Sequence, residues 1–215
     1  MTFGSVFGRT FSPTFQPSSQ AAASSAEFVP TDISNCLIWI DFSDMDYLFT
    51  DAGSTKVAND GDLIYQANDK SGNSNNITQA TQAYRAAYKT GIQNSKSIAR
   101  FDGSNDYYSM SLTANAGSFT FVFAYNNNET FNNSPNASGY LLDSQTGRFV
   151  IASSSANDPF NKIGWYDGSW HEIANATNGW QTNQFNLPNG GNGAVYRNGS
   201  SLGTAAYSEK AIGGT

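Results

Sequence analysis

Acidic side chains and a single histidine are the first residues to test for catalysis. A retaining glycoside hydrolase needs two carboxyl groups about 5 Å apart, commonly carried by one strand as alternating acids. The glutamates form no such pattern; they are Glu27, Glu129, Glu172 and Glu209. His171 is the single histidine, so a metal site built from several histidines is excluded. We therefore predict no catalytic residue and a protein that is not an enzyme, with a glycoside hydrolase as the least favoured alternative.

Aspartates gather in two turn-like segments and could bind a hard cation. Asp41, Asp44 and Asp46 follow an apolar run, while Asp102 and Asp106 flank a glycine-containing turn. Calcium prefers carboxylate and carbonyl oxygens. The same side chains also cap turns by accepting hydrogen bonds from backbone N–H groups. A Ca²⁺ site at Asp41, Asp44 and Asp46 is the one metal site predicted, and turn capping is its alternative.

Aromatic residues with nearby amides suggest a carbohydrate site. An aromatic ring stacks on the apolar face of a sugar, and amides or carboxylates bind its hydroxyl groups. The candidates lie close in the sequence: Trp165, Tyr166, Trp170, Trp180 and Asn178, with Asp167, Asn175 and Gln181 among them. The alternative is that these aromatic side chains belong to the core of a sandwich.

Residues 1–26 differ from the rest of the chain and predict an extended arm. Phenylalanine recurs at every fourth position, at Phe3, Phe7, Phe11 and Phe15. The intervening glycines and prolines oppose a helix, at about 1 and 3 kcal/mol each. A Ser/Ala-rich spacer follows from residue 18 to residue 26. We expect the four rings to bind a groove on another protein, the alternative being a tail with incidental phenylalanines.

Residues 27–215 predict a single all-β domain. Phe119 to Tyr125 alternates aromatic and other residues, as a half-buried strand does. Asn198-Gly199 between two β-type runs is a strong hairpin signal. Further strands are expected at residues 37–42, 63–66, 98–101, 149–152, 162–166, 184–187 and 194–197, and the one candidate helix is 79–88. Many short strands with almost no helix indicate a sandwich or a barrel.

Several motifs occur in an order that resembles the laminin-G-like family of the concanavalin-A-like superfamily. They are Leu37-Ile38-Trp39-Ile40-Asp41, Asp69-Lys70-Ser71-Gly72-Asn73, Arg100-Phe101-Asp102-Gly103-Ser104 and Tyr196-Arg197-Asn198-Gly199. The resemblance covers residue 35 to the end and implies an antiparallel jelly-roll β-sandwich, as in phage and bacterial surface proteins. Such domains usually continue past the last hairpin, so we expect a chain that extends beyond Thr215 or an edge completed by another segment.

Net charge and composition limit the kinds of binding partner that we expect. The net charge is -6 and the pI near 4.5, which argues against a nucleic-acid partner. No continuous apolar run is long enough for a membrane span, and the first residues lack the pattern of a secretory signal. One cysteine excludes an intramolecular disulfide. Only 13% of residues are charged, a composition common in surface-exposed β proteins.

Together these features predict a phage virion surface protein, a capsid-decorating or fibre-type adhesin. It would assemble in the host cytoplasm without a signal peptide, and its arm would bind other virion proteins in a multimeric assembly. The sandwich would face outward, where host-surface glycans are candidate ligands. The alternative is a stand-alone bacterial carbohydrate-binding lectin.

Overall fold

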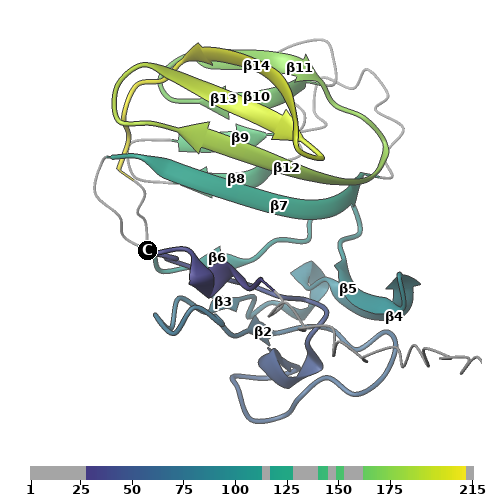
Figure 1. The fold of residues 1–215 in the computed structure, drawn as a ribbon. Helices are drawn as coiled ribbons and strands as arrows, with labels where there is room; N and C mark the ends of the chain where they lie inside the picture. The colour runs from purple at the N-terminus through teal and green to yellow at the C-terminus, as the bar shows by residue number, and fades with distance from the viewer. Residues whose placement is uncertain (1–27, 113–116, 128–139, 145–148, 153–161, 212–215) are drawn as a thin grey trace, which may run out of the picture.

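The computed structural model describes residues 28–112, 117–127, 140–144, 149–152 and 162–211 (Figure 1). The arm with Phe3, Phe7, Phe11 and Phe15 lies outside these residues. The described chain is all-β and antiparallel, as predicted. Its helical turns are short 3-10 segments: η1 (Pro30–Asp32), η2 (Met45–Tyr47) and η3 (Gln82–Tyr84). No helix in this part of the chain is long and apolar enough to cross a membrane.

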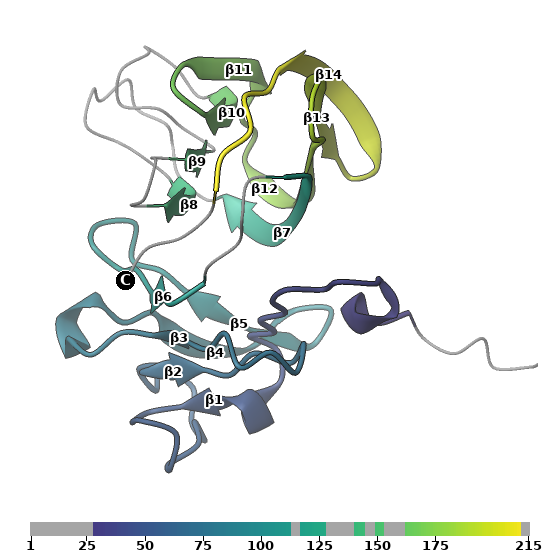
Figure 2. The ribbon, with the colours of Figure 1, turned by 90° about the vertical axis from the view of Figure 1, so that its left-hand side faces the viewer.

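Residues from 119 onward form two four-stranded antiparallel sheets. One sheet has the order β14-β13-β12-β7, with β7 (Phe119–Asn127), β12 (Gly179–Leu187), β13 (Asn192–Arg197) and β14 (Ser200–Ala206). The other has the order β11-β10-β9-β8, with β8 (Tyr140–Ser144), β9 (Phe149–Ala152), β10 (Lys162–Tyr166) and β11 (Trp170–Asn175). Figure 2 shows the two sheets face to face. β11 lies beside β14.

The space between these sheets is filled by a hydrophobic core. The buried residues include Ile163 and Trp165 from β10 and Phe185 and Val195 from the facing sheet, all with no exposed surface. On β7 the aromatic rings point toward this core and the intervening residues are exposed, which confirms the alternation read from the sequence. Burial of these side chains is the main contribution to the stability of this half.

The hairpin at Asn198-Gly199 is also confirmed. Asn198 has φ 49° and Gly199 has φ 79°, the left-handed conformations that a tight two-residue hairpin requires. The Asn198 side chain also accepts a hydrogen bond from the Thr182 N–H at 2.8 Å. The turn is therefore attached to β12 as well as joining β13 to β14.

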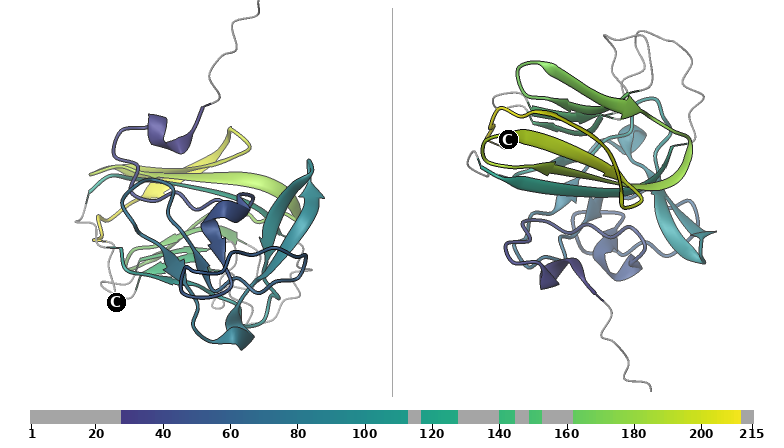
Figure 3. Two further views of the ribbon diagram at one scale, coloured as in Figure 1. Left: turned by 90° about the horizontal axis from the view of Figure 1, so that it is seen from below. Right: turned by 45° about the horizontal axis from the view of Figure 1, so that its top comes forward.

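Residues 28–112 form a second unit of structure with its own, smaller core. Its four-stranded sheet has the order β1-β2-β3-β6, with β1 (Leu48–Phe49), β2 (Gln66–Ala67), β3 (Ile77–Thr78) and β6 (Ser109–Met110). A hairpin of β4 (Ala87–Gln93) and β5 (Lys96–Arg100) lies beside it. Buried Leu48, Val57, Ile64, Ala67 and Tyr88 form its core. Figure 3 shows this unit and the two larger sheets from two further directions.

Three local predictions differ from the structure. The expected strand at residues 37–42 belongs to no sheet, and Phe42 lies in a turn. Of the expected strand at residues 63–66, only Gln66 lies in a strand, and Leu63 forms an isolated bridge to Ala87. The expected helix at 79–88 is reduced to η3, and β4 begins at Ala87. Side-chain bonds hold this segment out of a longer helix: the Gln79 side chain accepts from the Thr81 N–H, and Arg85 donates to the Gln79 and Ala80 carbonyl groups.

Candidate functional sites

The Asp69 loop holds the opening segment of the described chain. Asp69 Oδ1 accepts from the N–H groups of Trp39 at 2.9 Å and Ser71 at 2.8 Å. Its Oδ2 accepts from the Ser71 hydroxyl at 2.7 Å and the Asn75 N–H at 3.0 Å. The carboxylate therefore forms the turn of its own loop and also substitutes for a neighbouring strand at Trp39. We call Asp69 together with its partners Trp39, Ser71 and Asn75 the Asp69 bracket.

Amide side chains of the same loop complete this attachment. Asn73 Nδ2 donates to the Cys36 carbonyl at 2.8 Å, and Asn75 Nδ2 donates to the Leu37 carbonyl at 2.7 Å. The Lys70 N–H donates to the Trp39 carbonyl at 2.8 Å. Backbone groups of Cys36, Leu37 and Trp39 are thus bound by loop 69–75 rather than by a neighbouring strand.

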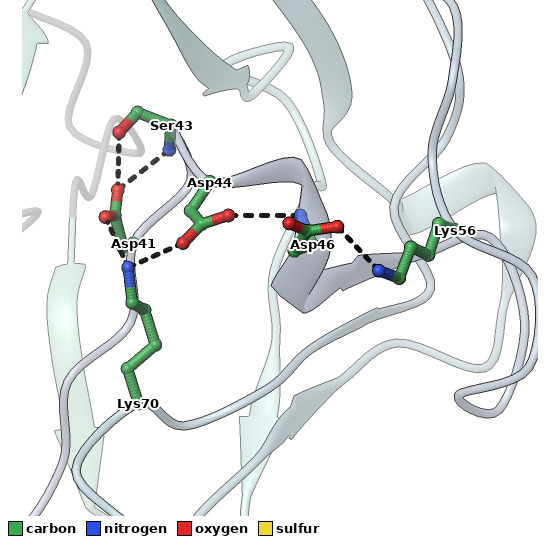
Figure 4. A network of polar contacts seen from close by, with 6 residues as sticks. All are labelled: Asp41, Ser43, Asp44, Asp46, Lys56 and Lys70. Carbon is green, nitrogen blue, oxygen red and sulfur yellow. Dashed lines mark hydrogen bonds and ion pairs between the residues drawn. The ribbon is translucent and has the colours of Figure 1, made fainter.

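Lys70 lies between two of the three aspartates predicted to bind calcium. Its Nζ is 3.0 Å from Asp41 Oδ2 and 2.8 Å from Asp44 Oδ2 (Figure 4). The rings of Trp39 and Tyr47 lie against the ammonium group, with centroids 4.4 and 5.1 Å from Nζ. Only 14% of the Lys70 side chain is exposed. A lysine ammonium group therefore supplies the positive charge between Asp41 and Asp44.

Asp46 points away from this pair. Its carboxylate accepts from exposed Lys56 at 2.6 Å, while the Asp46 N–H donates to Asp44 Oδ1 at 3.1 Å (Figure 4). The second acidic segment behaves as a turn cap, because Asp102 Oδ1 accepts from the N–H groups of Ser104 and Asn105. Within the described residues no three His, Cys, Asp or Glu side chains group as metal ligands. The calcium prediction stays a prediction, and these contacts fit its turn-capping alternative.

These contacts shift the pKa values of Asp69, Asp41 and Lys70. Burial alone would raise the pKa of Asp69, but its hydrogen bonds from Trp39, Ser71 and Asn75 outweigh burial and lower it. Burial likewise opposes ionisation of Asp41, while Ser43 and Lys70 lower the pKa of that carboxyl overall. Although burial disfavours its charge, the pKa of Lys70 is raised because Asp44 and Asp41 stabilise the ammonium form. All three groups are therefore charged at neutral pH.

The predicted carbohydrate residues lie in separate places. Trp165 has no exposed surface and belongs to the core, as the alternative interpretation expected. Tyr166 and Trp170 are partners in register on β10 and β11, and their ring centroids are 5.3 Å apart. Trp180 is the second residue of β12 and is 37% exposed; exposed Asn178 precedes it by two residues. Since Trp170 starts β11 and Asn175 ends it, Trp180 lies beyond the opposite end of that strand.

The Tyr166–Trp170 pair faces away from the core. Trp165 and its register partner His171 point inward, so their neighbours Tyr166 and Trp170 occupy the outer surface of the sheet. Glu172 and Asp143 are exposed on the same side of the sheet. Fully buried Val150 lies between Asp143 and Tyr166 in the register. Two aromatic rings and two carboxylates therefore lie on one outer sheet surface.

His171 is part of a structural contact that the sequence did not indicate. Its Nε2 is 3.0 Å from Asp167 Oδ1, and its ring lies 5.4 Å from that of Trp165. Asp167 is buried, and its Oδ2 accepts from the Ser208 N–H at 2.7 Å. Asp167 thus joins β11 to the segment that follows β14.

A sequence motif associated with serine hydrolases was not among the sequence-based predictions. Gly199-Ser200-Ser201-Leu202-Gly203 has the form Gly-x-Ser-x-Gly. In an α/β-hydrolase this pattern lies on a sharp turn from strand to helix. Here it runs from a hairpin turn into β14, and Ser201 is exposed on the side of the sheet opposite the core, whereas His171 points inward. These two side chains are therefore on different faces of the sandwich-like half.

Comparison of the chain with known protein families, with curated proteins and with solved structures gave no match.

Proposed function

We propose that this chain is a non-catalytic surface protein of a phage particle, of the capsid-decorating or fibre type. In this proposal its all-β body is a laminin-G-like jelly roll, and residues 1–26 anchor it to other virion proteins. The observation that carries the proposal is the structural role of the aspartates in the acidic motifs. Asp41, Asp44 and Asp69 hold loops together, as expected of a rigid body built for display.

The arrangement of the sheets supports the jelly-roll part of the proposal. The chain passes between the two larger sheets from β7 to β8 and again from β11 to β12. Crossings of this kind are typical of β-sandwiches, whose strands do not all follow one another within one sheet. The motifs that resemble the laminin-G-like family also have compatible structural roles, because the Asp69 bracket fixes the Trp39 segment.

The Tyr166–Trp170 pair supports glycan binding as part of this function. The two rings contact each other on an outer sheet surface, with the Glu172 carboxylate nearby in register with Gly164. Tyrosine and tryptophan provide large contact areas with few rotatable bonds, which reduces the entropy lost on binding. A neutral or amino-substituted sugar is the class of ligand that suits two rings beside carboxylates.

Incorporation into particles tests the virion assignment. Particles are purified on a density gradient from a lysate of the strain that carries the gene, and the chain is detected by mass spectrometry and immunogold labelling. A variant lacking residues 1–20 should keep the circular dichroism spectrum of the full chain and be lost from the particle band. Retention of this variant in particles would disprove the role of the arm, and absence of the full chain would disprove the virion assignment.

A glycan array tests the ligand assignment separately. Trp170→Ala should abolish binding that the full chain shows, while Trp180→Ala, at a distant exposed tryptophan, serves as the matched control. If Trp180→Ala removes binding and Trp170→Ala does not, the site has been placed on the wrong sheet. If no glycan binds the full chain, the glycan part of the proposal is wrong and the display part is unaffected.

A further inference from the structure

Among the residues that the structure describes, no charged side chain lies on the outer surface of the β7–β12–β13–β14 sheet. Its outward positions are the even-numbered residues of β7 (120–126), β12 (180–186) and β13 (192–196), with residues 201, 204 and 206 of β14. They are threonine, asparagine, glutamine, serine, alanine, valine, tyrosine and tryptophan. We call this surface the charge-free face; it is turned toward the viewer in Figure 1.

The other large sheet differs in this respect. Its outer surface includes Lys162, whose Nζ donates to Asn175 Oδ1 at 2.9 Å, and exposed Asp143 and Glu172. Charged side chains usually cover solvent-facing strands and prevent sheets from associating. Their complete exclusion from one sheet surface, in a chain with 28 charged residues (11 basic and 17 acidic), marks that surface as different from the rest.

Polar groups on the charge-free face are held by one another. Asn186 Oδ1 accepts from Gln184 Nε2 at 2.8 Å and from Thr120 Oγ1 at 3.2 Å, across β12 and β7. The same face carries exposed apolar groups: Val122, in register with Gln184, is 62% exposed, and Trp180, toward the other end of β12, is 37% exposed. The side chains are therefore partly ordered before any partner binds, which reduces the entropy cost of association.

A second copy of this chain is the partner that the charges favour. Each copy has a net charge of -6, so two copies repel each other wherever their acidic surfaces meet. The charge-free face is a surface on which two copies can meet without bringing like charges together. Depletion of charge and enrichment of aromatic residues are also what distinguishes the centre of a protein–protein interface.

The area of the face sets the strength of this contact. Strands about 4.8 Å apart with a mean length of about eight residues span roughly 19 by 26 Å, or about 500 Å² per copy. Two copies would then bury about 1,000 Å², the lower limit for a specific interface. A contact of this size is weak and depends on concentration or on neighbouring contacts in an assembly.

We propose that the charge-free face packs against the same face of a second copy and forms a two-fold symmetric, sheet-on-sheet dimer. This inference does not depend on the virion assignment, because it concerns association of the isolated chain. Such a contact would let neighbouring copies support one another when they are held side by side.

Analytical ultracentrifugation of the full chain over a concentration series tests this inference. The wild-type chain should sediment as a monomer–dimer mixture with a dissociation constant in the micromolar range, on the order of 10⁻⁵ M. Val122→Lys combined with Thr182→Lys should raise this constant at least tenfold, because dimerisation would bury several like charges at one interface. Gln82→Lys combined with Ala83→Lys, both on exposed η3, adds the same charge; this matched control should leave the constant unchanged.

The direction of the charge change makes the test specific. Each added lysine lowers the overall negative charge and so weakens the general repulsion between copies. Weaker association of the double variant can therefore come only from the face itself, provided that its circular dichroism spectrum is unchanged. The inference is overturned if the wild-type chain stays monomeric up to about 0.1 mM, or if the double variant associates as strongly as wild type. The second result would place the contact elsewhere, for instance on the arm.

Discussion

Replacement of Asp69 by alanine should be among the most damaging single changes in residues 28–112. Asp69 is 8% exposed and accepts hydrogen bonds from three backbone N–H groups and one hydroxyl group. Alanine removes every acceptor and leaves the N–H groups of Trp39, Ser71 and Asn75 without their partner. The segment around Trp39 then has no strand beside it to replace the lost contacts.

The expected loss of stability can be worked from these bonds. A buried donor left unsatisfied costs about 1–3 kcal/mol. The donors here are only partly buried, so the lower limit applies, and three of them give about 3 kcal/mol for Asp69→Ala. Asp69→Asn keeps one carbonyl oxygen and hence about half of these contacts, which predicts a loss of about 1.5 kcal/mol.

Urea unfolding followed by circular dichroism measures these losses. Asp102→Ala is the matched control, because it removes an exposed turn-capping aspartate from a glycine-containing loop of similar sequence. Hydrogen exchange gives a second, local measurement, since the Trp39 and Asn75 amides should lose protection in Asp69→Ala. The reasoning is refuted if Asp69→Ala is no less stable than Asp102→Ala, or if these two amides stay protected.

Three further predictions concern other parts of the chain. Lys70→Met should lower the free energy of unfolding by about 2 kcal/mol, between the values for exposed and buried ion pairs, because Asp41 and Asp44 lose their shared cation. Lys70→Arg should recover part of this loss in the same urea assay. Gly164→Ala should prevent formation of the β10–β11 pair, because a Cβ would overlap the His171 carbonyl group; loss of the cooperative thermal transition would show this, and a normal transition would contradict it. Burial raises the pKa of Tyr108, whose hydroxyl donates to the Ile64 carbonyl at 2.8 Å. The stability that neutral Tyr108 contributes is fully present below the unfolded pKa of 10.0 and should be lost as pH rises above that value. Tyr108→Phe should flatten that alkaline decline in a series of urea titrations.

Local patterns in the sequence predict the strands that depend on local information. The β7 alternation and the Asn198-Gly199 turn are confirmed because strand period and positive φ are properties of neighbouring residues. The run at residues 37–42 looks the same locally but receives its partners from a loop some thirty residues later, such as Asp69. No local pattern contains that information.

The aromatic candidates show the same limit at the level of a site. Trp165 and Tyr166 are adjacent in a strand, so they must lie on opposite faces, and this much follows from the sequence. Which of them is buried depends on the facing sheet, where Phe185 and Val195 complete the core around Trp165. The role of Lys70 was likewise hidden, because its sequence neighbours give no sign that Asp41 and Asp44 lie beside it.

Acid should loosen residues 28–112 before it loosens the two larger sheets. Among the described residues, the carboxyl groups with lowered pKa values are Asp41, Asp46, Asp51, Asp60, Asp62, Asp69 and Asp102. All of them lie before β7, while the core between the larger sheets is apolar.

A carboxyl group with a lowered folded pKa contributes stability that is present above its unfolded value, near 3.8, and is lost as pH falls toward its folded value. Asp106 has a raised pKa and acts in the opposite direction, but it is one group against several. Hydrogen exchange at pH 3 and pH 7 separates the two parts, because protection at Trp39, Ser71 and Asn75 should fall at the lower pH while that of Phe185 persists. Equal losses at all four amides would mean that the chain unfolds as one cooperative unit. The polar contacts within residues 28–112 and the apolar core between the larger sheets would then stabilise each other.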